Sequence, residues 1–389
     1  HAARTGRDRH RFRQGRVTLL GISAAASFLL ALVLGASALL APVAAFHVAF
    51  ALGVLPLIFG AMLHFVPVLT RSASPHRFIA SLPFVAQAVG LFVVLALQGW
   101  LPRWVLHPAA CADLLAALVL LVWMVRRARR ALGSPHPGWR WYMASLAMLV
   151  LAMVSVPLLT AGVMPLALRN FHLHANTLGF VGLAALGTLP VLMPTVLARP
   201  DPQAANWLRE HWLLALSGVL LLATGSAFYW PLAVIGAVML LMAAGLLLLH
   251  WRKCFGLAAL WADGAAAPLA AALIAYLLLV LAGILHASGE GGGSVLVPAF
   301  AAGFLLPLVT GALSQLLPVW RFAGPQTPAR GEMRARLVRF GRWRAMAFPT
   351  AGLAFAFGLY PLNLMLAGLG LLLFLADLIF ALRVKSLPR

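Results

Sequence analysis

Two histidines stand at corresponding places in two long apolar segments of this chain. His47 precedes Gly60 by the same interval that separates His174 from Gly187, and a proline follows each glycine at a matching distance. An imidazole placed in hydrocarbon needs a partner, because its neutral form still presents one donor and one acceptor. If the two segments adjoin, the two rings can face one another and supply both axial nitrogens of a haem iron. His47 and His174 are therefore the predicted metal ligands.

Further residues could complete or line such a site. Small residues let a macrocycle approach a helix backbone, which makes cofactor-binding candidates of four glycines: Gly60, Gly179, Gly182 and Gly187. His172 lies about 200° around the helix from His174, so only one of the two can face inward. The repeat favours His174, and leaves His172 as a residue behind the ligand, a copper ligand or an interfacial side chain. We expect haem b, with copper as a further metal.

Two more histidines are candidate metal ligands at other places. His64 lies on the same predicted helix as His47, but about 25 Å further along its axis, so the two cannot share one ligand. A hydrogen bond across the bundle is the alternative for His64. His286 ends an apolar segment beside a glycine-rich loop on the side of His47. It could complete a metal site there, or simply mark the end of a helix.

These residues sit in a chain that is too apolar for a soluble domain. Of its 389 residues, 63% are hydrophobic and 10% are charged, and the mean hydropathy is +0.97. Apolar runs of about twenty residues predict membrane-spanning helices. The expected spans are twelve: 17–41, 44–69, 78–100, 106–125, 141–165, 172–197, 210–228, 231–250, 265–286, 295–319, 343–358 and 361–382. We expect a single all-α membrane domain over 17–385, preceded by a basic tail, 1–16.

The net charge of +21 is distributed in a way that indicates topology. With these spans, only Arg103 and Arg169 of the 29 Lys and Arg lie on the side opposite to the others. Basic loops stay in the cytoplasm, so both termini are expected there. The arginines then meet anionic lipid headgroups of the bilayer. Nucleic acid is not an expected partner.

The spacing of three glycines predicts an internal repeat. Gly60, Gly187 and Gly311 are about 125 residues apart, which corresponds to four spans each. They fall in spans 44–69, 172–197 and 295–319, and the third carries Pro298 in place of the histidine. Twelve helices in three four-helix repeats imply pseudo-threefold symmetry about the membrane normal. Many transporters instead divide six plus six.

This layout resembles the architecture of subunit I of the haem-copper oxidases. The segment from His174 through Gly179 to Gly182, together with His47 on the second helix, is similar to the NnrS family of twelve-span bacterial haem- and copper-containing proteins linked to nitric oxide stress. The chain departs from the family where Val48, in place of glutamate, follows His47. It also lacks the paired histidines of an oxidase copper centre, so proton-pumping oxygen reduction is not expected.

The resemblance implies a bacterial inner-membrane protein that binds nitric oxide or another diatomic ligand, detoxifies it, or transfers electrons in respiration or denitrification. With both axial positions filled, a haem would serve electron transfer, whereas an open position would bind a gas. Electrons would come from an electron-donor protein or from quinol. The alternative is a transporter, or a structural subunit of a membrane complex, without a cofactor.

Overall fold

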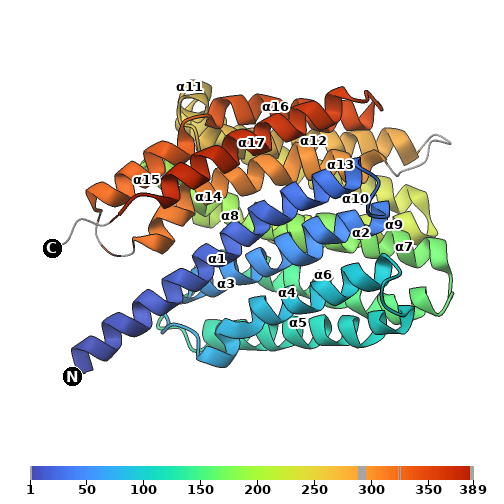
Figure 1. Ribbon diagram of the computed structural model, residues 1–389, viewed down its shortest axis with the longest axis horizontal. Helices are drawn as coiled ribbons and strands as arrows, with labels where there is room; N and C mark the ends of the chain where they lie inside the picture. The colour runs from blue at the N-terminus through green and yellow to red at the C-terminus, as the bar shows by residue number, and fades with distance from the viewer. Residues whose placement is uncertain (1, 288–294, 323, 325, 386–389) are drawn as a thin grey trace.

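The computed structural model of this protein is a bundle of long helices. It describes residues 2–287, 295–322, 324 and 326–385, and for 2–17 and 286–287 it describes the backbone alone. Within these residues there are helices and links but no strand, which confirms the expected all-α class. The long helices run alongside one another, and the start of α1 and the end of α17 lie at the same end of the bundle (Figure 1).

Short links join helices that alternate in direction. The first part of the chain forms α1 (Ala2–Ala36), α2 (Pro42–His47), α3 (Leu55–Leu69), α4 (Arg77–Leu97), η2 (Arg103–Val105) and α5 (Leu106–Arg129). The middle part forms α6 (Gly138–Thr160), α7 (Pro165–His174), α8 (Leu183–Leu197), α9 (Ala204–Phe228) and α10 (Trp230–Phe255). The last part forms α11 (Leu257–Ala262), α12 (Ala266–Ala287), α13 (Leu296–Phe300), α14 (Leu306–Arg321), α15 (Pro328–Val338), α16 (Gly341–Ala356) and α17 (Leu362–Leu382).

Three π-helical segments each connect two of these helices into one longer helix. They are η1 (Val48–Val54) between α2 and α3, η3 (Ala175–Gly182) between α7 and α8, and η5 (Ala301–Leu305) between α13 and α14. Pro56 and Pro307 stand in the first turn after η1 and η5. A proline has no N–H and clashes with the carbonyl four residues before it, so the turn ahead of it widens. In η3 no proline follows directly, and Gly179 and Gly182 lie within the wide turns.

Within the described residues, eleven helices are long and apolar enough to cross a membrane, which indicates a multi-pass membrane protein. The twelfth expected span, 343–358, falls on α16, which has only 16 residues. That is about 24 Å of helix, short of the hydrocarbon thickness of about 30 Å. Residues 2–16 continue α1 as a helix. Between the expected spans 295–319 and 343–358 the chain forms a further helix, α15.

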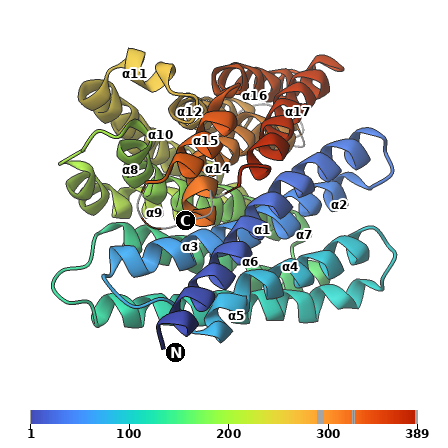
Figure 2. The ribbon, with the colours of Figure 1, turned by 60° about the vertical axis from the view of Figure 1, so that its left-hand side comes forward.

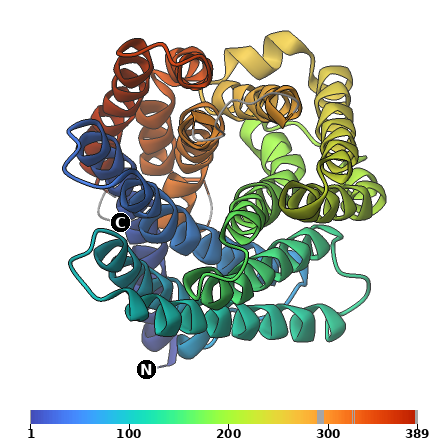
Figure 3. The ribbon, with the colours of Figure 1, turned by 90° about the vertical axis from the view of Figure 1, so that its right-hand side faces the viewer.

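The three helices that contain π segments are the most buried of the eleven; we call them the central helices. Figure 3 views the bundle with many of its helices nearly end on. The first central helix packs against α1, the second against α6 and the third against α12. In addition, α6 contacts α3, α12 contacts α8 and α1 contacts α14. Because α1 contacts both the first and the last central helix, the helix contacts form a closed ring. Figure 2 shows α1 crossing the other helices of the bundle.

Each central helix carries a glycine against which a side chain of its neighbour is packed. A Cβ added at Gly187 would lie only 2.4 Å from the Cβ of Trp141 on α6. The corresponding pairs are Gly60 with Leu20 of α1 and Gly311 with Leu269 of α12. These glycines allow close approach of helices, which is how small residues act in membrane bundles.

The arginines gather at the end of the bundle where α1 begins, which we call the basic end. Arg334 of α15 connects several elements there: its guanidinium donates to Gln315 Oε1 at 2.7 Å, to Asp263 Oδ2 at 2.8 Å and to Val196 O at 3.1 Å. Asp263 in turn accepts from the backbone N–H groups of Ala265 and Ala266 at the start of α12. The other end, where α2 and α7 begin, we call the histidine end.

Candidate functional site at the histidine end

The central helices present their histidines directly before the π segments. His47 is the last residue of α2 and is followed by η1, and His174 is the last residue of α7 and is followed by η3. In the third central helix Phe300 occupies the place before η5, two residues after Pro298. π-helical turns are rare and often occur at functional sites. The two predicted ligands therefore occupy equivalent local structures at one end of the bundle.

The backbone fixes the tautomer of each ring. The Nδ1–H of His47 donates to Val43 O at 2.7 Å, and that of His174 donates to Asn170 O at 2.8 Å, four residues earlier on the same helix. His172 differs, because its Nδ1–H donates across to Ala152 O of α6 at 3.0 Å. A carbonyl can only accept, so the proton sits on Nδ1 and leaves the lone pair on Nε2. Histidines that bind metals commonly have this arrangement.

Of the two histidines, His172 rather than His174 lies within electrostatic range of His47. The two side chains are close enough for their charges to affect one another. His174 instead points toward α9, where Ser226 Oγ lies 3.0 Å from its Nδ1. The Ser226 hydroxyl donates to Ala223 O, so its oxygen accepts from His174. Among the described residues, no hydrogen-bond partner reaches the Nε2 atom of His47, His172 or His174.

Side chains of the protein itself lie against three of the four glycines predicted to bind a cofactor. The places next to Gly60 and Gly187 are filled by Leu20 and Trp141, as described above. At Gly179 an added Cβ would lie 2.8 Å from Met148 Cβ, so Met148 fills that place as well. The donor atoms thus fit an imidazole-bound metal, whereas the backbone at these three glycines is covered by the protein's own side chains.

Gly182 has a different neighbour, the phenol of Tyr276 on α12. A Cβ at Gly182 would lie 3.4 Å from the Tyr276 hydroxyl oxygen, which is ordinary contact. Tyr276 is fully buried, and its hydroxyl has no hydrogen-bond partner within the described part of the chain. Buried hydroxyls are nearly always bonded, so this group is a place where a water or ligand atom would be stabilised.

The remaining histidine candidates do not join this group. His64 lies on α3 toward the basic end, where its ring packs edge-on against Trp320 at 5.9 Å between centroids. The backbone of His286 belongs to α12, but its side chain lies outside the described residues. Both predicted roles are still predictions.

A second set of metal-type donors lies at the basic end. Side-chain atoms of Asp201, His250 and Cys254 all lie within 4.8 Å of one another. His250 Nε2 is 2.7 Å from Asp201 Oδ2, and Asp201 Oδ1 accepts from the backbone N–H of Gln203 at 3.0 Å. The carboxylate is thus satisfied by protein groups, so the cluster is stable without an ion.

Sequence reasoning missed the groups that orient the histidines. Every residue has a backbone carbonyl, so the sequence does not show that the carbonyl of Ala152 accepts a hydrogen bond from a histidine. Ser226 is one of many small polar residues in apolar spans. Only Val43 and Asn170 could have been inferred, because a histidine often bonds the carbonyl four residues earlier.

Two comparisons with known proteins add nothing to this picture. Neither the protein-family models nor the curated protein sequences give a match to the chain.

Proposed function

We propose that this protein binds a redox-active metal at the histidine end, through Nε2 of His47 and Nε2 of His172. One observation carries the proposal: each Nδ1–H is bonded to a backbone carbonyl while no described residue bonds Nε2, and the two rings lie within electrostatic range of one another. The resemblance to the NnrS family implies haem b iron as the metal. Copper is the other candidate, and it requires no space for a macrocycle.

The role we propose for this centre is binding of nitric oxide or another diatomic ligand, or electron transfer. A haem would supply an iron that binds such a gas or changes its oxidation state. The protein would hold the two imidazoles in a fixed tautomer and keep the surroundings apolar. Its reductant would be an electron-donor protein or quinol, because the described chain is a helical bundle without a separate soluble domain.

The finer architecture belongs to the same proposal. Three features support three four-helix repeats with pseudo-threefold symmetry. They are the π segment in each central helix, the glycine of each central helix against which a neighbouring side chain packs, and the ring of helix contacts. We count α16 as the twelfth span, tolerated by local thinning of the bilayer. The arginines at the basic end support a cytoplasmic location for that end and for both termini, in a bacterial inner membrane.

The experiment is to purify the protein in mild detergent, measure iron and copper, and record a reduced-minus-oxidised spectrum. We expect His47→Ala and His172→Ala each to lose most of the bound metal. His107→Ala is the matched control, because His107 lies at the same end and its Nε2 contacts Thr160 Oγ1 at 3.3 Å. A loss in His174→Ala together with retention in His172→Ala would return the ligand role to His174. Equal loss in the control would refute the assignment.

A bundle without a cofactor, acting as a transporter or as a structural subunit of a membrane complex, is the second candidate. The observation in its favour is that Leu20, Met148 and Trp141 fill the spaces at three of the predicted cofactor-binding glycines. Protein that contains no metal after expression with added iron, copper and haem precursor would support this candidate and would end the metal proposal.

A further inference from the structure

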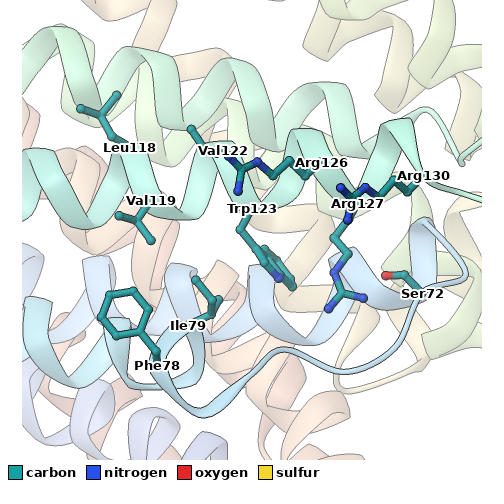
Figure 4. A pocket seen from close by; sticks show the side chains of 10 residues that line it. All are labelled: Ser72, Phe78, Ile79, Leu118, Val119, Val122, Trp123, Arg126, Arg127 and Arg130. Atoms are coloured by element: carbon teal, nitrogen blue, oxygen red, sulfur yellow. The ribbon is translucent and has the colours of Figure 1, made fainter.

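A cavity of about 760 Å³ opens at the basic end between α4 and α5. Its apolar wall includes Phe78, Ile79 and Val119, and its mouth carries Arg126, Arg127 and Arg130. Figure 4 shows Trp123 and Arg127 projecting from α5 toward the segment before α4, with Ile79 nearby. Among the described residues that line the cavity, Ser72 supplies the only hydroxyl and none is acidic.

The positive groups at the mouth have no anionic partner within the described part of the chain. The three salt bridges found there all involve other residues. Arg127 lies over the ring of Trp123, with its guanidinium carbon 5.6 Å from the ring centroid. The indole Nε1–H of Trp123 is buried, and no described residue accepts its hydrogen bond. Three guanidiniums and an unpaired N–H donor are complementary to a negatively charged group that can accept hydrogen bonds.

The shape of the cavity identifies the kind of acceptor. From Leu118 to Arg130, the lining follows α5 for about 18 Å, which is comparable to one leaflet of a hydrocarbon core about 30 Å thick. The charged groups occupy only the end nearest the membrane surface, while Leu118 and Val122 further in are exposed and apolar. A free phosphate would leave this apolar wall uncovered, whereas an acyl chain would cover it.

We propose that the cavity between α4 and α5 binds an anionic phospholipid. The phosphate lies among Arg126, Arg127 and Arg130, a phosphate or ester oxygen accepts from Trp123 Nε1, and an acyl chain lies along Phe78 and Val119. Basic clusters at a membrane surface attract anionic headgroups; here the apolar wall and the indole donor add a site for one molecule. This proposal is independent of the metal at the histidine end.

Native mass spectrometry of delipidated protein tests it, with phosphatidylglycerol and phosphatidylethanolamine added at equal concentrations. We expect phosphatidylglycerol to bind with the greater affinity. The double variant Arg127→Gln/Arg130→Gln should weaken that binding about tenfold, and Trp123→Phe should weaken it by a smaller factor while keeping the ring. The matched control, Arg252→Gln/Lys253→Gln, removes the same charge from the basic end and should bind as the wild type does.

Three results would overturn the proposal. Equal binding of the two lipids would remove the need for a negative headgroup. Equal weakening in the control would mean that only the overall charge matters. Displacement of the lipid by glycerol phosphate at similar concentration would indicate an anion site in which the apolar wall plays no part. Circular dichroism of each variant checks that it is folded.

Discussion

Replacing Gly187 by alanine is expected to destabilise the bundle, because the place of the new methyl group is already taken. The added Cβ would lie 2.4 Å from the Cβ of Trp141 and 3.0 Å from its Cγ. The Cβ atom is bonded directly to the α6 backbone, so no rotamer change of Trp141 can move it away. The helices α6 and α8 must separate instead.

Alanine at Gly60 or Gly311, the corresponding glycines of the other two central helices, should cost less stability than alanine at Gly187. At Gly60 the obstacle is Leu20 Cδ1 at 2.7 Å, the mobile tip of a side chain. At Gly311 it is Leu269 Cγ at 3.0 Å and Ala265 O at 3.1 Å. Alanine favours a helix over glycine by about 1 kcal/mol, and overpacking costs about 1–3 kcal/mol. We therefore expect a net loss of about 1–2 kcal/mol for Gly187→Ala, less for Gly311→Ala, and little change for Gly60→Ala.

Unfolding in mixed micelles with increasing dodecyl sulfate, followed by circular dichroism, measures these differences. Gly245→Ala is the control, because nothing lies within 4 Å of the added Cβ at that position of α10; it should not destabilise the protein. The reasoning is wrong if Gly187→Ala is as stable as the wild type, or if Gly60→Ala loses more stability than Gly187→Ala.

Two further variants test the links at the basic end. Burial lowers the pKa of His136, in the link before α6, below its usual range. The unfolded state therefore binds the proton more readily than the folded state. The stability associated with neutral His136 above about pH 6.5 is consequently lost as the pH falls. His136→Asn should therefore show a smaller drop in Tm between pH 7 and pH 5, and an equal drop would contradict this. Arg334→Met removes the bonds to Gln315 and Asp263 and should lower the unfolding free energy by about 2–3 kcal/mol, whereas Arg342→Met, at an exposed site, should change it little.

The positions of the long helices could be predicted from hydropathy, because a membrane-spanning segment must carry its apolar length in its own sequence. The three spans singled out by spaced glycines also became the three most buried helices. The segment predicted at 343–358 is found as α16, shifted by two residues and equally short, so the pattern placed the helix but did not give it the length of the other spans. No sequence pattern predicts that Leu20, Trp141 and Leu269 pack against the glycines of the central helices, because any large side chain can fill such a space.

The choice between His172 and His174 could not be made from the repeat. Equivalent positions in helices around a common axis point toward equivalent neighbours, and they meet only when they point at the axis. His47 and His174 each bond the carbonyl four residues back, which sets the same ring orientation on each helix. His172, which has no counterpart in the repeat, bonds Ala152 O of α6 instead, and of the two it is the one within electrostatic range of His47. The ligand role remains a prediction for both.

The contact between α1 and α14 has a consequence for biosynthesis. Gly21 of α1 lies against Leu313 and Leu317 of α14, with an added Cβ 2.9 Å from Leu313 Cδ2. Chains are made from the N-terminus and begin to fold in that order. Because α1 is made long before α14, this face of α1 must lie against lipid, or against an insertion factor, until α14 arrives.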